Sequence, residues 1–242
     1  MCRDTELMKI EFTCPLCGRV TEKELLLPPE LMKPFGGRLT ANCAECGKRR
    51  EEAERAEKEA FETRRRAEEA RIPPEFRVWD RRLGNHSLAS WIRENRANNL
   101  LLIGDFEIGK TRAAACNLLL EARSGKRCRF YDFPELSKEY AKELQQSMLS
   151  AIDFQVRLLS LDILLIDDLA KRRINDTAGE LVYDLVNKVY EGARARLWLT
   201  SNHDTRELVG KFSNLDTGGA VLSRIDRMAD EGRFKIWKGK RS

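Results

Sequence analysis

A glycine-rich segment in the middle of the chain has the residue types and spacing of a phosphate-binding loop. Residues 104–111 read GDFEIGKT and match the pattern G-x-x-x-x-G-K-[ST]. In such a loop the backbone N–H groups surround the phosphates of a nucleotide, the lysine reaches the β and γ oxygens, and the hydroxyl binds Mg²⁺. The alternative is a glycine turn beside a solvated lysine. We predict that ATP and Mg²⁺ bind at Gly104, Asp105, Phe106, Glu107, Ile108, Gly109, Lys110, Thr111 and Arg112.

Two apolar runs end in side chains that could complete this chemistry. The run at 163–166 is followed by Asp167 and Asp168, and we expect Asp167 to support Mg²⁺ and Asp168 to orient and polarise the attacking water. The run at 197–200 is followed by Ser-Asn, and Asn202 could hydrogen-bond the γ-phosphate or that water. Acidic strand ends and ordinary turn chemistry are the alternatives. The phosphate-loop pattern upstream favours the catalytic interpretation.

Four of the seven cysteines form two C-x-x-C pairs with 25 residues between them, which is the pattern of a zinc site. Gly18 and Gly47 follow the pairs, where tight turns need glycine. Four thiolates leave no position for water, so the metal would be structural. Redox dithiols are the alternative, but they normally occur singly. We expect Cys2 to be spare, and Cys116 and Cys128 to lie in the core. The predicted zinc ligands are Cys14, Cys17, Cys43 and Cys46.

Residues 48–71 contain only charged and polar residues apart from alanines and Phe61, and they include neither glycine nor proline. This composition predicts a solvated linker helix with salt bridges along it and no face to bury. A coiled coil is the alternative, but the apolar heptad repeat is missing. Pro73 and Pro74 follow the helix.

From residue 72 onward, apolar runs alternate with helical patterns, which is typical of a parallel α/β sheet. We predict helices at 111–123 and 177–190, the second opening with Thr177 and Glu180 at capping-box spacing. The predicted strands are 100–103, 129–133, 163–166, 197–200 and 234–237.

The overall composition excludes some classes of protein. No apolar run approaches the length of a membrane span, and the first residues lack the apolar stretch of a signal peptide. We therefore expect a cytoplasmic protein without a membrane partner. The formal net charge of +5 permits a nucleic-acid partner without requiring one.

Together these residues resemble the AAA+ ATPases of the bacterial DnaC-type helicase-loader group and the related IstB transposition ATPases. The resemblance covers residues 72–242 and rests on LLIGDFEIGKT, LLIDDL, LVYDLVNKVYEG, LTSN and AVLSRI. Some loaders have a similar cysteine module that binds the replicative helicase. The resemblance implies a lidless AAA+ core with a five-stranded parallel sheet and helices on both faces. The expected domains are a zinc-binding domain at 1–47, a linker helix at 48–71 and an ATPase domain at 72–242.

The resemblance also assigns roles to single residues. The family usually has glycine where this chain has Glu107, and a carboxylate near the phosphates would reduce nucleotide affinity. Only 18 residues follow Arg224, which leaves no room for a helical lid. The implied roles are Lys110 and Thr111 in the P-loop, Asp167 and Asp168 in Walker B, Asn202 as the first sensor, and Arg224 as arginine finger with Arg227 as the substitute.

The first functional hypothesis is an ATP-hydrolysing loader that delivers a hexameric replicative helicase onto single-stranded DNA and assembles head to tail with other copies. The second is an IstB-like ATPase that binds target DNA during transposition. The third is a nucleotide-gated adaptor with little hydrolysis, which Glu107 and Asp168 motivate. The fourth is a zinc-ribbon nucleic-acid binder with a decayed P-loop, which the intact motifs oppose.

DNA contacts are the least specified part of the sequence. The pairs Arg172/Arg173 and Arg194/Arg196 flank the predicted sheet and could bind phosphates without reading sequence. The aromatic residues of one predicted strand could stack on bases, although such residues more often belong to a core. These aromatic residues are Phe130, Tyr131 and Phe133.

Overall fold

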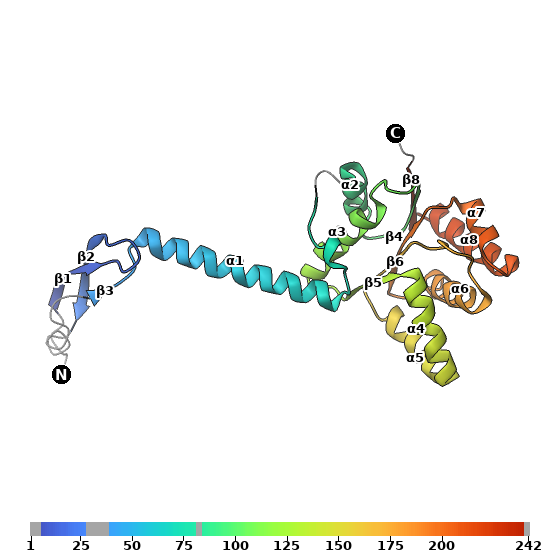
Figure 1. The fold of residues 1–242 in the computed structure, drawn as a ribbon, viewed down its shortest axis with the longest axis horizontal. Coiled ribbons are helices and arrows are strands. Elements are labelled where there is room, and N and C mark those ends of the chain that lie inside the picture. Colours follow the sequence, from blue (N-terminus) through green and yellow to red (C-terminus); the bar gives the residue numbers. More distant parts are fainter. Residues whose placement is uncertain (1–5, 28–38, 81–83, 240–242) are drawn as a thin grey trace. The chain divides into compact units, whose positions relative to one another are not determined.

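The computed structural model describes residues 6–27, 39–80 and 84–239, and the chain divides into two compact units, 1–62 and 63–242 (Figure 1). Cys2, which we expect to be a spare thiol, lies outside the described residues. Among the described residues, no helix is both long and apolar enough to span a membrane.

The C-terminal unit is built on a sheet of five parallel strands in the order β5-β6-β7-β4-β8, which confirms the predicted α/β fold. Each interior strand is an apolar run buried on both faces, as parallel strands covered by helices require. The strands are β4 (Asn99–Gly104), β5 (Cys128–Asp132), β6 (Ile163–Asp167), β7 (Arg196–Ser201) and β8 (Phe234–Gly239).

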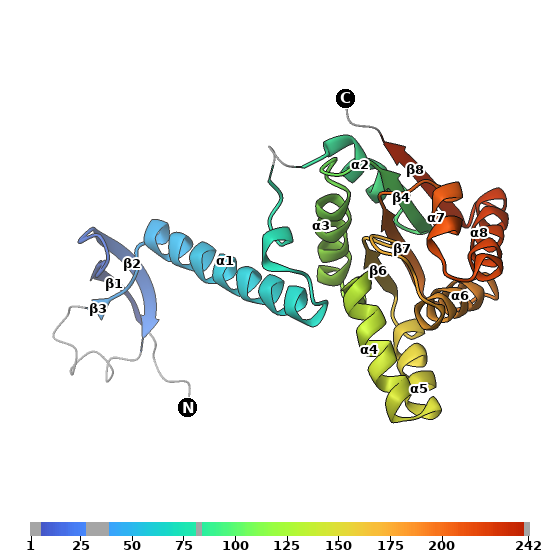
Figure 2. The same cartoon turned by 45° about the vertical axis from the view of Figure 1, so that its right-hand side comes forward.

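Helices cover both faces of this sheet (Figure 2). In β4, Leu100 and Leu102 pack toward α2 and α3, whereas Leu101 and Ile103 pack into the core formed with α4 to α8. The first face is covered by α2 (His86–Glu94) and α3 (Lys110–Arg123), with the short 3₁₀ helix η3 (Pro74–Phe76) against α3. The second is covered by α4 (Phe133–Gln146), α5 (Met148–Leu159), α6 (Asp176–Tyr190), α7 (Thr205–Lys211) and α8 (Leu215–Asp230).

Two local predictions in this unit are wrong. Phe133 does not end a strand but begins α4, because the proline that follows it suits the first turn of a helix. The helix α6 is capped by the Asn175 side chain, which accepts from the Ala178 N–H at 2.9 Å, and not by Thr177. The three aromatic residues considered for base stacking lie in the core, where each is at most 6% exposed: Phe130, Tyr131 and Phe133.

The N-terminal unit contains the antiparallel strands β1 (Glu6–Thr13) and β2 (Val20–Leu27), with β3 (Leu39–Thr40) parallel to β1. The charged helix α1 (Ala44–Glu69) begins four residues earlier than predicted and is common to both units. As predicted, ion pairs join residues one turn apart along it, including those of Arg50 with Glu54 and of Arg64 with Glu68.

The end of the charged helix departs from the prediction of a helix with nothing to bury. Ala67 and Ala70 are at most 2% exposed and belong to the core beneath α2 and α3. The chain leaves the helix through Arg71, whose φ is +54°, before the two prolines.

Candidate functional site

The glycine-rich loop joins the C-terminal end of β4 to the first turn of α3, as the phosphate-binding mechanism requires. Gly109 caps α3 with a φ of +84°, a conformation that favours glycine. Gly104 pairs with Gly239 of β8, and a Cβ on Gly104 would lie 2.3 Å from the Gly239 carbonyl oxygen. The loop conformation therefore depends on both glycines of the motif.

The Lys110 ammonium group is buried and uses all three of its donors. Its Nζ donates at 2.8 Å to the carbonyl oxygens of Gly104 and Asp105 and to Oδ1 of Asn202. Burial lowers the pKa of Lys110, and the nearby charges of Asp168 and Asp167 oppose that shift. The loop thus holds its lysine at the mouth of the site by contacts from two strand ends.

Thr111 and Asp167 are joined across the site. The Thr111 hydroxyl donates to Oδ1 of Asp167 at 2.8 Å, and the Thr200 hydroxyl donates to the same oxygen at 2.6 Å. Burial raises the pKa of Asp167 to about 6, although both hydroxyls act in the opposite direction. A carboxylate and a hydroxyl at one point are the oxygen ligands that Mg²⁺ prefers.

Asp168 and Asn202 are in contact beside the pair formed by Thr111 and Asp167. Asn202 Nδ2 donates to Oδ1 of Asp168 at 3.3 Å, while Lys171 Nζ donates to its Oδ2 at 2.7 Å. Asn202 follows β7, which lies between β4 and β6 in the sheet. This strand order explains why Asn202 reaches both Lys110 and Asp168.

Strained backbone is concentrated near these groups. Three of the four non-glycine residues with positive φ among the described residues are Glu107 (+64°), Asp168 (+57°) and Ala170 (+67°). Such conformations cost on the order of 1 kcal/mol each and often occur at functional sites. Glu107 is exposed at the loop tip.

Arg112 and Ile108 of the loop contact the segment that precedes the sheet. Arg112 Nη1 donates to the carbonyl oxygens of Glu75 at 2.9 Å and Val78 at 3.2 Å. The Ile108 carbonyl oxygen accepts from Asn85 Nδ2 at 3.1 Å. Phe106, in contrast, is 63% exposed.

Arg224 and Arg227 lie on α8, and only the first is held in place. Arg224 Nε donates to Oδ1 of Asn187 at 2.6 Å, its Nη2 donates to the Tyr183 hydroxyl at 2.8 Å, and its guanidinium lies 4.6 Å from the Tyr183 ring centroid. Within the described residues these contacts stay on α6 and α8 and do not reach the P-loop. Arg227 is exposed.

The four predicted zinc ligands come together in the N-terminal unit. Their sulfur atoms all lie within 4.8 Å of one another, and the Sγ atoms of Cys17 and Cys43 are 3.7 Å apart. Sulfurs at the usual zinc distance in a tetrahedron are about 3.8 Å apart, so the cluster fits zinc. Gly18 has the expected turn conformation, with φ at +70°, but Gly47 is helical because α1 begins directly after Cys43 and contains Cys46 in its first turn.

The comparison with protein families matches residues 49–231 to the family of IstB-like ATP binding proteins. The chain belongs to this family. The match covers the whole constellation around Lys110, so this IstB-like chain has the nucleotide-binding domain that its motifs predict. Among the curated proteins, no match is found.

Two solved structures, those of DnaI and DnaA, show the same fold. DnaI matches with a TM-score of 0.52 and 16% identity over 70% of this chain and 94% of its own. AMPPCP-bound DnaA from Aquifex aeolicus matches with a TM-score of 0.51 and 16% identity over 69% of this chain and 50% of its own. The DnaC helicase loader gives a TM-score of 0.49 and 20% identity over 63% of this chain and 85% of its own.

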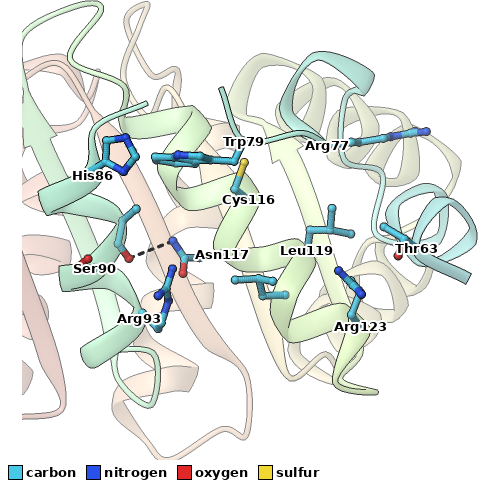
Figure 3. Close-up of a pocket in the computed structure, with 12 residues that line it drawn as sticks. Thr63, Arg77, Trp79, His86, Ser90, Arg93, Cys116, Asn117, Leu119 and Arg123 are labelled. Atoms are coloured by element: carbon cyan, nitrogen blue, oxygen red, sulfur yellow. Dashed lines mark hydrogen bonds between the residues drawn. The ribbon is translucent and has the colours of Figure 1, made fainter. Parts of the chain in front are cut away.

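A cavity of about 430 Å³ lies beside α2 and α3 in this IstB-like domain (Figure 3). Trp79 and His86 form one end, with ring centroids 5.1 Å apart. Lys110, Thr111 and Asp167 do not line it. We therefore do not assign the nucleotide phosphates to this cavity.

Sequence reasoning missed two side chains at the nucleotide site. Thr200 accepts from the Asp168 N–H at 2.9 Å in addition to its bond with Asp167, so one hydroxyl contacts both acidic residues. Lys171 neutralises Asp168 from the loop after β6. The position of Thr200 just before Ser-Asn was the available signal, because a polar residue that ends a buried apolar strand needs a partner.

Proposed function

We propose that this chain is a Mg²⁺-dependent ATPase of the cytoplasm that loads a hexameric replicative helicase onto single-stranded DNA. The observation that carries the proposal is the hydrogen-bonded set Lys110, Asn202 and Asp168, because it places a cation, an amide and a carboxylate in sequence across the site. The fold that the chain shares with DnaI and the cysteine cluster are both compatible with a loader.

In this proposal each residue of the site has one task. Lys110 binds the β- and γ-phosphates, and Thr111 and Asp167 hold Mg²⁺. When bound, Mg²⁺ neutralises charge that develops on the phosphates. Asp168 orients and polarises the attacking water. Asn202 holds Asp168 by a hydrogen bond and would also hydrogen-bond the γ-phosphate.

The arginine finger would act between subunits. Arg224 contacts Asn187 and Tyr183 of its own chain, which would fix its guanidinium for presentation to the site of a neighbouring copy. In a head-to-tail assembly, each subunit would present this arginine to the ATP of its neighbour. Only a subunit at the end of an open row would have no such neighbour. Arg227 is the substitute, since it is exposed on the same helix.

The zinc-bearing unit would bind the helicase. Its four cysteines leave no ligand position for water, so Zn²⁺ would stabilise the fold and take no part in catalysis. The ATPase unit would then couple nucleotide state to release of the helicase.

The experiment is steady-state ATP turnover by the zinc-replete full chain, with and without single-stranded DNA. Lys110→Ala provides the blank. We expect single-stranded DNA to raise ATP turnover and the Lys110→Ala variant to show none. We also expect the immobilised full chain to retain the replicative helicase of the source cell. Turnover that persists in the blank, or failure to retain the helicase, would contradict the loader proposal.

An IstB-like role in transposition is the second candidate, and the family match favours it. Stimulation of turnover by duplex DNA but not by single strands, without helicase capture, would support it.

A nucleotide-gated adaptor is the third candidate, motivated by Glu107. ATP binding without turnover, with biological activity retained by Asp168→Asn and lost in Lys110→Ala, would support that role.

A further inference from the structure

The outer edge of the sheet beside β5 is hollowed by two adjoining cavities. β5 is an edge strand, and the cavities of about 440 and 200 Å³ share Arg129 and Leu161. The larger lies between β5 and the hairpin of α4 and α5, and the smaller lies between β5 and the end of α1. We call the continuous surface that they form the β5 groove.

The β5 groove is strongly basic. Seven basic side chains line it against three acidic ones, an excess nearly as large as the formal net charge of +5 for the whole chain. The lining of the groove therefore carries an excess of positive charge. The basic residues are Arg66, Arg71, Lys126, Arg127, Arg129, Lys142 and Arg157, and the acidic ones are Glu69, Glu139 and Glu143.

Two of these cations are available to a ligand. Arg71 already pairs with Glu139, and Arg157 pairs with Glu143. The side chains of Arg129 and Lys142 have no hydrogen bond or ion pair with any residue in the part of the chain that the structure describes. Arg129 is half-buried where the cavities join, so an anion there would contact a cation that its own chain does not neutralise.

The aromatic residues of the groove are unsuited to base stacking. Tyr131 and Phe154 are 4% and 5% exposed. The guanidinium of Arg71 lies 5.1 Å from the Tyr131 ring centroid, and that of Arg157 lies 5.5 Å from the Phe154 ring centroid. The ligand would therefore meet cations and not ring faces.

The edge of β5 is also closed to an added peptide strand at its middle residue. The Phe130 N–H donates to the Ala70 carbonyl oxygen at 2.8 Å, so the chain itself occupies this backbone donor. Peptide binding by strand addition needs such donors to be free. Charge recognition of an extended polyanion fits the groove better.

We propose that the β5 groove binds the phosphodiester backbone of single-stranded DNA without reading its bases. The inference deepens the proposed function and rests on it, because it names the surface through which the ATPase would contact DNA. Arg129 would form the central phosphate contact, and Lys142 would form a second one along the groove. Arg172 and Arg173 lie outside this surface.

The test uses the zinc-replete full chain with Arg129→Gln and Lys142→Gln combined. Fluorescence anisotropy with a labelled mixed-sequence single strand would be measured across a salt series. Loss of two phosphate contacts should reduce the slope of log K against log salt by about 1.4 and weaken binding about 10- to 30-fold near 0.1 M salt. The effect should be the same for oligonucleotides of different sequence.

The matched control combines Arg93→Gln and Arg123→Gln. These exposed arginines line the cavity beside α2 and α3 and have no pairing partner among the described residues, so the control removes the same charge elsewhere (Figure 3). We expect it to retain the wild-type slope. An equal loss in the control, or an unchanged slope in the Arg129 and Lys142 variant, would overturn the inference.

Further measurements separate this inference from the proposed ATPase function. Both double variants should retain DNA-free ATP turnover, because neither pair contacts the P-loop. Turnover without DNA binding by the wild type would overturn the β5 groove as a DNA site and leave the ATPase proposal standing. Tighter binding of duplex DNA or of polyglutamate than of the single strand would overturn the assignment of the ligand.

Discussion

Lys110, the first residue of α3, and Asn202, which follows β7, are joined by a hydrogen bond of 2.8 Å from the ammonium Nζ to the amide Oδ1. The same amide donates through Nδ2 to Asp168. Asn202 therefore links the group proposed to bind phosphate with the group proposed to orient water. Because of this position, we expect a substitution of Asn202 to affect ATP turnover more than nucleotide affinity.

Replacing Asn202 by alanine should reduce ATP turnover about 10- to 100-fold while changing nucleotide affinity much less, since small misplacements of catalytic groups have effects of that size. Lys110 keeps two carbonyl partners in the variant, so the phosphate loop should retain its shape. Turnover and the equilibrium binding of a fluorescent ATP analogue would be measured on the same preparation. Parallel loss of both would instead identify Asn202 as a support for the loop alone.

Thr200→Val should destabilise the protein by about 1–3 kcal/mol, because it removes a buried hydroxyl that contacts Asp167 and the Asp168 N–H. Valine has nearly the same shape, so packing should be preserved. The free energy of unfolding would be measured with urea.

Thr177→Val is the matched control for that substitution. Thr177 is not the cap of α6, whose first turn is capped by Asn175, so the control should change stability by less than about 0.5 kcal/mol. A Thr200 variant as stable as this control would show that the Asp167 network contributes little to folding.

Glu107→Gly should tighten ATP binding about 3- to 10-fold. The change removes a negative charge near the phosphates and places glycine at a φ of +64°, which other residues rarely adopt. Glu107→Gln removes only the charge, so comparison of the two variants by calorimetry separates electrostatics from backbone freedom. Weaker binding by both variants would mean that the carboxylate assists nucleotide binding.

The P-loop, the acidic pair and the five strands could be predicted from the sequence because each is a local signal. A buried apolar run and a glycine-lysine motif specify strand and loop wherever they lie in the chain. The observed strand ends differ from the predicted ones by one or two residues, as at Phe133. The reason is that the turn chemistry of the next element decides where strand pairing stops.

The contacts between the motifs could not be predicted in this way. Thr200 meets Asp167 only because β7 lies beside β6. No single segment of the sequence specifies the order of the strands in the sheet. Lys171 meets Asp168 through a loop that turns back at residues of positive φ, including Ala170. The β5 groove likewise combines residues from the end of α1, from β5 and from α4 and α5.

Zinc should be bound at about one ion per chain and should be lost from Cys43→Ser. The Cys43 sulfur is buried among the other three, so the substitution removes a ligand that the small unit cannot replace. Zinc content would be measured by atomic emission after gel filtration. Cys116→Ser, a change of thiol on α3, should retain the metal, and equal loss from both variants would contradict the assignment.

The pH dependence of stability should depend in part on Asp162, which begins the turn into β6. Its Oδ2 accepts from the Arg127 N–H at 2.9 Å and its Oδ1 accepts from Arg194 Nη2 at 2.7 Å. The backbone hydrogen bond from Arg127 is the largest cause that lowers the pKa of Asp162 below its usual value. A carboxyl with a lowered pKa in the folded state stabilises the fold above the unfolded-state pKa near 4 and loses that stabilisation as pH falls further.

Asp162→Asn should therefore cost about 1–3 kcal/mol near pH 7 and progressively less below about pH 4, where the wild-type carboxyl itself becomes protonated. Urea unfolding of both proteins from about pH 7 to about pH 3 would measure this narrowing gap. The exposed Asp153 on α5 supplies the control substitution Asp153→Asn, which should leave the curve unchanged. A gap that stays constant with pH would mean that the Asp162 contacts stabilise the turn by geometry and not by charge.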